Sequence, residues 1–216
     1  MNLSKPKIIL SIGKPASGKT NSTKWLVLKN SVDRKLFNFG IVFSRTGNIN
    51  NDYDWMPPHL VIQGYQESVL KAYLSKIEEH IHQHKKPPKN FIIFEDLQAI
   101  LNKNDPFINN LLAVHRHYGT YILMNFQTIK GGSTTLREIV NYAIVYNTKR
   151  RDTIECIYRE LGTLIDTYEE FKEIFQSITS EKYTAMLYDS SIEDKNDNYK
   201  IYKAPNMQAF KIKLNF

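Results

Sequence analysis

The sequence contains only one cysteine and no long apolar stretch. A single cysteine, Cys156, excludes a disulfide within the chain and a zinc site built from several cysteines. No apolar run reaches the ~20 residues that a membrane-spanning helix needs. The first ten residues lack the apolar stretch and the small-residue cleavage site of a signal peptide. We therefore expect a soluble protein that is not secreted, does not insert into membranes and stays in a reducing compartment.

Length and charge narrow the class of protein further. The 216 residues fit one α/β domain, and a hydrophobic fraction of 42% is that of a globular chain. A formal net charge of +7 favours a polyanionic partner, because each neutralised phosphate releases counterions. Abundant Asn, Ile, Lys and Tyr also suggest A/T-rich coding, which would produce the same basic excess. Charge alone leaves both interpretations open.

Short apolar runs alternate with helical patterns along the chain. Buried strands are predicted at 7–12, 37–44, 91–94, 121–125 and 142–146. Helices are predicted at 18–28, 66–83, 107–114 and 136–140. Strands that alternate with helices over short intervals predict an α/β fold with a mainly parallel central sheet of at least five strands, flanked by helices.

The remainder of the chain is less regular but contains no linker or internal repeat. A helix is predicted at 168–178 and a strand at 183–188. We therefore predict one domain over 1–216, with a core at about 5–190 and a C-terminal extension at about 190–216.

The segment Gly13–Thr20 matches the pattern G-x-x-x-x-G-K-[ST] at every fixed position. It lies directly after a predicted strand and at the start of a predicted helix. Glycines let successive backbone N–H groups point at phosphate oxygens, and the helix start adds its positive dipole end. Lys19 would reach the β- and γ-phosphates, and the Thr20 hydroxyl would bind Mg²⁺. This predicts a P-loop NTPase that binds ATP and Mg²⁺. The predicted nucleotide-binding residues are Gly13, Lys14, Pro15, Ala16, Ser17, Gly18, Lys19, Thr20 and Asn21.

Polar residues close two later strands. Glu95 and Asp96 follow the apolar run 91–94, and Gln127 lies just beyond the strand at 121–125. The carboxyl ends of parallel strands share one edge, so these groups should face the phosphate loop. One acid could hold Mg²⁺ and the other could polarise the attacking water, while an amide could contact the γ-phosphate. The alternatives are a solvated helix start for the acids and an ordinary loop residue for Gln127.

This order of motifs resembles the FtsK–HerA superfamily, and within it the poxvirus-type viral genome-packaging ATPases, over roughly residues 5–190. The resemblance implies an ATP-hydrolysing motor that translocates double-stranded viral DNA into a preformed capsid, in the virion or at the viral assembly site in the host cytoplasm. It implies that Thr20 and Glu95 lie on the metal side, that Asp96 activates water and that Gln127 is the sensor. The family usually has Asp where Glu95 stands, so the roles of the two acids could be exchanged.

The resemblance also implies a homo-oligomeric ring in which an arginine completes the neighbouring subunit's site. Arg116 is the first candidate and Arg137 the second, although each could be a surface ion-pair residue. Basic residues in loops after the later strands could contact DNA phosphates without reading sequence, or could simply be solvated. These candidates are Lys130, Lys149, Arg150 and Arg151.

Two other functions remain open at this point. A nucleotide or small-molecule kinase also uses a P-loop, although no arginine-rich lid is evident in the sequence. A nucleotide-dependent assembly or secretion factor would act on protein instead of DNA. His80 and His84 share a helix face without a third ligand nearby, so cations at a helix C-terminus explain them better than a metal site does.

Overall fold

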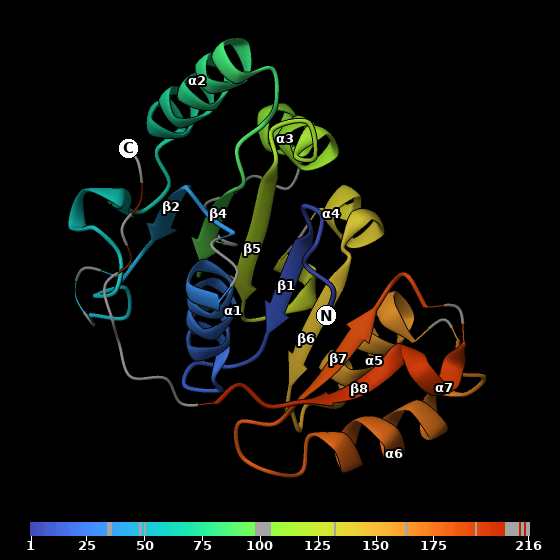
Figure 1. Ribbon diagram of the computed structural model, residues 1–216. Helices are drawn as coiled ribbons and strands as arrows, with labels where there is room; N and C mark the ends of the chain where they lie inside the picture. Colours follow the sequence, from blue (N-terminus) through green and yellow to red (C-terminus); the bar gives the residue numbers. More distant parts are fainter. Residues whose placement is uncertain are drawn as a thin grey trace.

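The computed structural model describes residues 1–33, 36–47, 49, 51–97, 105–131, 133–162, 164–192, 194–205, 212 and 214. Eight strands form one sheet in the order β3-β2-β4-β5-β1-β6-β7-β8 (Figure 1). The six strands from β3 to β6 run parallel, and β7 and β8 are antiparallel additions. The strands are β1 (Ile8–Ile12), β2 (Phe39–Ser44), β3 (Val61–Gln63), β4 (Asn90–Glu95), β5 (Thr120–Phe126), β6 (Tyr142–Tyr146), β7 (Ala185–Asp189) and β8 (Tyr199–Tyr202).

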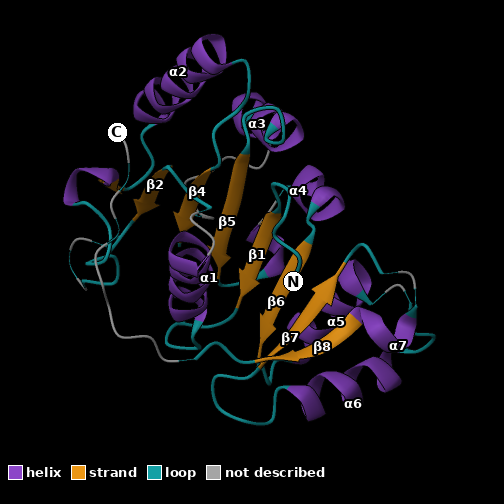
Figure 2. Cartoon of the chain, viewed as in Figure 1, coloured by secondary structure: helices purple, strands orange, loops and turns teal. Residues whose placement is uncertain are grey.

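Helices cover both faces of the sheet, as Figure 2 shows. The helices are α1 (Lys19–Asp33), α2 (Glu67–His84), α3 (Pro106–Val114), α4 (Thr134–Ile139), α5 (Arg151–Leu161), α6 (Tyr168–Ile178) and α7 (Lys195–Asn198), with short 3₁₀ turns at Pro58–Leu60 and Ile129–Gly131. Alternate residues of one strand enter different clusters: Ile9 packs with α1, whereas Ile8 packs with the other helices. The predicted α/β class with a mainly parallel sheet is thus confirmed.

All five predicted parallel strands are present, and the parallel part gains one short strand, β3. Helix α5 was not predicted, although Ile154, Ile157 and Leu161 are spaced for one helix face and are buried. Strand β8 lies in the predicted C-terminal extension, yet it pairs with β7 and continues the main sheet. The sheet therefore runs beyond residue 190, and residues 193, 206–211, 213, 215 and 216 of that extension lie outside the described part.

Strand direction places the connections at two opposite edges of the sheet. The phosphate loop follows β1 at the carboxyl edge, while Lys85, Lys86 and Lys89 precede β4 at the amino edge, as predicted. His80 and His84 share a face of α2, with ring centroids 4.2 Å apart. Within the described ranges, no helix combines the length and hydropathy needed to cross a membrane.

Candidate nucleotide-binding site

The loop between β1 and α1 has the backbone that a phosphate cradle requires. Ala16 has φ of 59° and Gly18 has φ of 112°, so residues with positive and negative φ alternate just before the helix. Such alternation turns successive N–H groups toward one point and forms an anion-binding nest. A Cβ at Gly13 would lie 2.6 Å from Ser17 Oγ and 2.8 Å from Tyr146 Cβ, so only glycine fits there. The sequence pattern therefore predicted a loop whose geometry suits phosphate.

Lys19 lies across this loop and is almost fully buried. Its Nζ donates to the carbonyl oxygens of Gly13 at 2.7 Å and Lys14 at 3.1 Å. Burial lowers the pKa of the ammonium group, while the nearby charges of Asp96 and Glu95 raise it. The ammonium group is thus held over the cradle by main-chain acceptors, which phosphate oxygens can replace.

Tyr146, the last residue of β6, fastens the start of α1 to the sheet. Its hydroxyl hydrogen-bonds to Ser22 and donates to the carbonyl of Gly18 at 3.1 Å. Burial raises the pKa of this hydroxyl to about 12, and the bond to Ser22 opposes the rise. The residue stays protonated at neutral pH, so it can keep donating to the loop.

Glu95 ends β4 and is surrounded by donors. Thr20 Oγ1 lies 3.2 Å from Oε1, Tyr53 OH donates to Oε2 at 2.6 Å, and the Asn125 amide also donates to Oε2. Burial raises the pKa of this carboxyl, while the bonds from Tyr53 and Asn125 oppose the rise. The contact between Thr20 and Glu95 pairs the two groups that were predicted to lie on the metal side.

Asp96 has a different environment from its neighbour. It follows β4 with φ of 52°, and its N–H donates to the carbonyl of Asn125 at 3.0 Å. Its Oδ1 is buried, and no residue in the described ranges hydrogen-bonds to it. A buried carboxylate oxygen without a protein partner is available to a water or a ligand. The two acids therefore differ in their contacts: both carboxylate oxygens of Glu95 accept hydrogen bonds, whereas Asp96 Oδ1 has no partner among the described residues.

The amide that reaches this site comes from within β5. Asn125 donates to Glu95 and accepts from Thr23 Oγ1 at 3.0 Å, so it links β4, β5 and α1. The predicted sensor, Gln127, lies just past the end of β5, is exposed and does not line the cavity. Asn125 was missed, although a lone polar residue within an apolar strand is a signal that sequence can provide.

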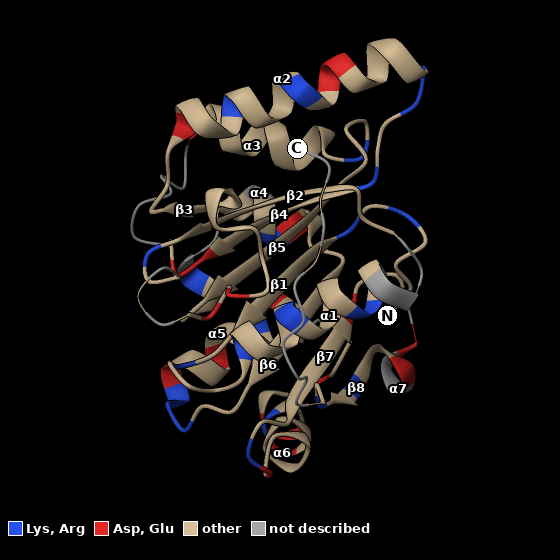
Figure 3. Ribbon diagram, turned by 60° about the vertical axis from the view of Figure 1, so that its left-hand side comes forward, with Lys and Arg blue, Asp and Glu red and all other residues tan. Residues whose placement is uncertain are grey.

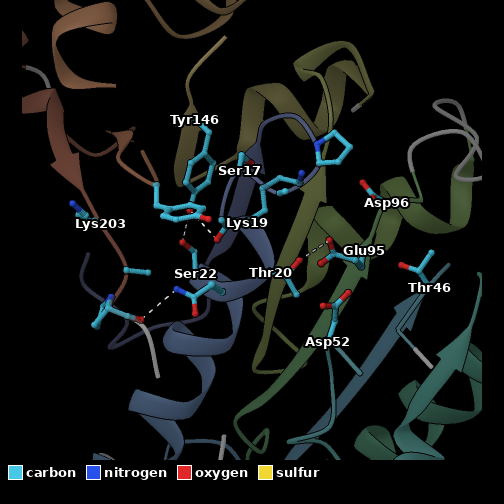
Figure 4. A pocket seen from close by; sticks show the side chains of 17 residues that line it. Ser17, Lys19, Thr20, Ser22, Thr46, Asp52, Glu95, Asp96, Tyr146 and Lys203 are labelled. Carbon is cyan, nitrogen blue, oxygen red and sulfur yellow. Dashed lines mark hydrogen bonds between the residues drawn. The ribbon is translucent and has the colours of Figure 1, made fainter. Parts of the chain in front are cut away.

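One cavity of about 990 Å³ is lined by Lys19, Thr20, Glu95, Asp96 and Tyr146 together with other residues (Figure 4). Thr46, Asp52, Glu95 and Asp96 lie on one side of Lys19, and Tyr146 and Lys203 lie on the other (Figure 4). The sequence predicted the phosphate loop and the two acids but missed the rest of the lining. The residues lining the cavity are Pro15, Ala16, Ser17, Gly18, Lys19, Thr20, Asn21, Ser22, Thr46, Asp52, Glu95, Asp96, Tyr146, Tyr183, Lys203, Ala204 and Pro205.

Neither candidate arginine lines this cavity. Arg116 is exposed in the turn before β5, at the amino edge of the sheet and away from the phosphate loop. Arg137 lies on α4, where its Nε is 3.1 Å from a carboxylate oxygen of Glu160. Neither can therefore complete the site of its own chain in this arrangement.

The four basic candidates lie together at the carboxyl edge. Lys130 is in the turn after β5. The hydrogen bond and charge of Arg150 lower the pKa of Asp152 at the start of α5, and the charge of Lys130 lowers it further. Arg150 and Arg151 are highly exposed, with ion pairs to Asp152 at 3.0 Å and Glu155 at 2.8 Å. Lys149 is also exposed beside them. Figure 3 shows this mixed charge at the start of α5.

Fold and site together define a P-loop nucleoside triphosphatase: a phosphate loop after β1, with acids at the end of a parallel strand two places away in the sheet. The family comparison then gives a specific assignment. Residues 3–215 match the family described as Poxvirus A32 protein, so the chain belongs to that family. The predicted resemblance to poxvirus-type ATPases is confirmed.

Solved structures with the same fold come from viruses and a bacterium. The genome packaging NTPase B204 of Sulfolobus turreted icosahedral virus 2, in complex with ATP-gammaS, has a TM-score of 0.68 at 16% identity, covering 96% of this chain and 100% of that one. B204 of Sulfolobus turreted icosahedral virus, a DNA-packaging ATPase, has a TM-score of 0.66 at 17% identity, with 94% and 100% covered. The cytoplasmic domain of the type VII secretion ATPase EccC of Thermomonospora curvata has a TM-score of 0.63 at 16% identity, with 93% and 25% covered. No curated protein sequence matches the chain.

Proposed function

We propose that this protein is an ATP-hydrolysing motor that translocates double-stranded viral DNA into a preformed capsid. The observation that carries the proposal is the convergence of Lys19, the Thr20–Glu95 pair and the open Asp96 oxygen on one cavity. Membership of the poxvirus A32 protein family supports it, as does the fold shared with viral packaging NTPases. Because one fold can serve many functions, the proposal depends on the residues of the site.

The chemistry of the cavity suits attack by water on a terminal phosphate. Lys19 and the N–H groups of the loop bind the phosphates, and Thr20 with Glu95 would hold the Mg²⁺ that accompanies them. Magnesium in nucleotide sites typically uses one or two protein oxygens together with phosphates. Asp96 has a buried oxygen free to accept a proton from water, and it is our candidate for the general base. Asn125 would couple Glu95 to β5 and α1 through its two hydrogen bonds. Gln127, which the sequence predicts to contact the γ-phosphate, stays a prediction.

The basic residues after β5 and β6 are the candidate contacts for the DNA backbone. Lys130, Lys149, Arg150 and Arg151 lie at the same edge of the sheet as the nucleotide cavity. The ion pairs of Arg150 and Arg151 are solvent-exposed and therefore weak, so DNA phosphates can compete for both guanidinium groups. Contacts of this kind carry no sequence information, which suits a motor that must move along any sequence.

The test is ATP turnover with and without duplex DNA, over a range of protein and salt concentrations. We expect DNA to stimulate turnover, activity per subunit to rise with protein concentration as a ring assembles, and salt to weaken DNA binding. Changing Lys149, Arg150 and Arg151 to glutamine should reduce the slope of log K against log salt by up to about 2.7, because each DNA phosphate that the protein neutralises contributes ~0.9 to that slope.

The matched control changes three basic residues at the other edge, Lys85, Lys86 and Lys89, to glutamine. All three are exposed, so their removal lowers net charge equally without touching the proposed DNA surface. Equal effects of the two triple variants would show that only overall charge matters. Turnover indifferent to DNA would contradict the motor and favour a factor acting on protein, and phosphoryl transfer to an added hydroxyl acceptor would indicate a kinase.

A further inference from the structure

The nucleotide cavity has two chemically different ends. One end carries the polar and acidic side chains Thr46, Asp52, Glu95 and Asp96, and Figure 4 shows them on one side of Lys19. The other end is lined by Tyr146, Tyr183 and the segment Lys203–Pro205. A triphosphate with its cation belongs beside Lys19 and the acids, so the rest of the nucleotide must extend toward the second end. A cavity of about 990 Å³ is large enough for a complete nucleotide.

Tyr183 has an unusual combination of exposure and position. Four large apolar side chains are exposed in the described part of the chain, namely Met1, Ile49, Tyr183 and Ile201, and of these only Tyr183 lines the cavity. Its ring reaches the phosphate loop, since a Cβ at Gly18 would lie 3.5 Å from Tyr183 Cδ1. A half-exposed aromatic ring at the mouth of a nucleotide cavity offers a flat surface on which a base can stack.

The backbone and a neighbouring cation hold this ring in place. Tyr183 has φ of 65°, in a turn closed by a hydrogen bond from Thr184 N–H to the carbonyl of Glu181 at 3.2 Å. Lys182 Nζ lies 4.8 Å from the ring centroid. A bulky residue in the left-handed region is uncommon, and such strain is most often found where function fixes a side chain.

The segment Lys203–Pro205 brings a second wall to the same end. It follows β8 directly, and the Asn21 side-chain amide donates to the Pro205 carbonyl at 3.3 Å, which ties it to the first turn of α1. Lys203 Nζ is 2.9 Å from a carboxylate oxygen of Glu181, so the segment is also joined to the turn that carries Tyr183. Tyr183 lies just before β7 and Lys203–Pro205 lies just after β8, so the pairing of these two antiparallel strands places both beside the phosphate loop.

We propose that Tyr183 and the segment Lys203–Pro205 form the subsite for the purine base of the nucleotide, with the Tyr183 ring stacking on the base. This inference rests on the proposed function only in that the ligand is a nucleoside triphosphate. It does not depend on DNA or a capsid as partner.

Calorimetric titration with two magnesium complexes separates base binding from phosphate binding: ATPγS carries a base, and inorganic tripolyphosphate does not. Tyr183→Ala should weaken ATPγS binding by about 5- to 150-fold, which is the range for loss of one aromatic stacking partner. Binding of tripolyphosphate should stay within about twofold of the unmodified protein, since ordinary solvent-exposed changes have small effects. Tyr183→Trp should retain the affinity for ATPγS, because indole also stacks.

Two further variants complete the test. Ile201→Ala removes another exposed apolar side chain on β8 that does not line the cavity, and both ligands should bind it normally. Asn21→Ala releases the Pro205 carbonyl, and it should weaken ATPγS more than tripolyphosphate. If Tyr183→Ala lost equal affinity for ATPγS and tripolyphosphate, the ring would shape the phosphate loop and not bind the base. If its affinity for ATPγS were unchanged, stacking would be excluded. Either result overturns the proposal. Failure of DNA stimulation would leave the base subsite standing, whereas an unmodified protein that binds neither ligand would end both proposals.

Discussion

Asp96→Asn is the substitution that most directly tests the division of labour between the two acids. Both oxygens of Glu95 accept hydrogen bonds from Thr20, Tyr53 and Asn125, whereas Asp96 keeps a buried oxygen without a described partner. A general base typically contributes about 10²- to 10⁴-fold to the rate. At ~1.36 kcal/mol for each factor of ten, losing it raises the activation barrier by roughly 2.7–5.5 kcal/mol. We therefore expect kcat to fall by about two to four orders of magnitude.

The same substitution should leave folding and nucleotide binding intact. Asp96 has φ of 52°, and asparagine is one of the few residues that tolerate this region, so the backbone can stay as it is. Steady-state turnover and the Kd for ATPγS should be measured together, with Asp54→Asn as a control because that acid is exposed and outside the cavity. A kcat within about threefold of the unmodified protein would refute the assignment, because such a change corresponds to less than ~0.7 kcal/mol in the barrier.

Two stability predictions follow from the contacts of Glu95. Burial raises the pKa of Glu95, so the folded protein binds its proton more tightly than the unfolded chain does, and the resulting destabilisation grows as pH rises above the ordinary carboxyl pKa. The Tm of Glu95→Gln relative to the unmodified protein should therefore be higher at pH 7 than at pH 5 when both are melted without nucleotide or Mg²⁺, and the opposite order would contradict this sign. Tyr53→Phe removes a donor to a carboxylate and should cost about 1.5–3 kcal/mol of unfolding free energy, against about 0.5–1.5 for Tyr121→Phe, whose buried hydroxyl donates to the neutral Leu3 carbonyl. Urea denaturation measures both values, and equal losses would mean that the charge of Glu95 adds nothing to the first bond.

The parts of the site that sequence predicted are those whose chemistry is local. Eight consecutive residues define the phosphate loop, and the strand before it and the helix after it are short-range patterns. Glu95 and Asp96 were predicted to share the cavity because parallel strands end at one edge, and both line it. Their different environments could not be predicted, since the donors to Glu95 come from loops and strands distant in sequence.

The parts that sequence missed depend on long-range placement. Tyr53 hydrogen-bonds to Glu95 although the two residues are 42 positions apart in sequence. From its sequence, the segment around Tyr53 is predicted only to form turns. Asn125 lies within β5, and only the pairing of β5 with β4 brings its amide to Glu95, so its contact could not be predicted from the end of the strand. Tyr183 and Lys203 belong to a tail without a motif, and only the pairing of β7 with β6 and β8 brings them to the cavity.

The positions of the two arginines distinguish them as candidates for action in trans. An arginine that completes a neighbour's site must lie away from its own nucleotide and be free to leave its own chain. Arg116 meets the first condition, being exposed at the amino edge while the cavity lies at the carboxyl edge. Arg137 would first have to break a partly buried ion pair with Glu160, with side chains only 21% and 26% exposed, and would leave that carboxylate without its cation. For a ring where one subunit's amino edge faces the next subunit's carboxyl edge, we therefore propose Arg116, ahead of Arg137, as the arginine that acts in trans.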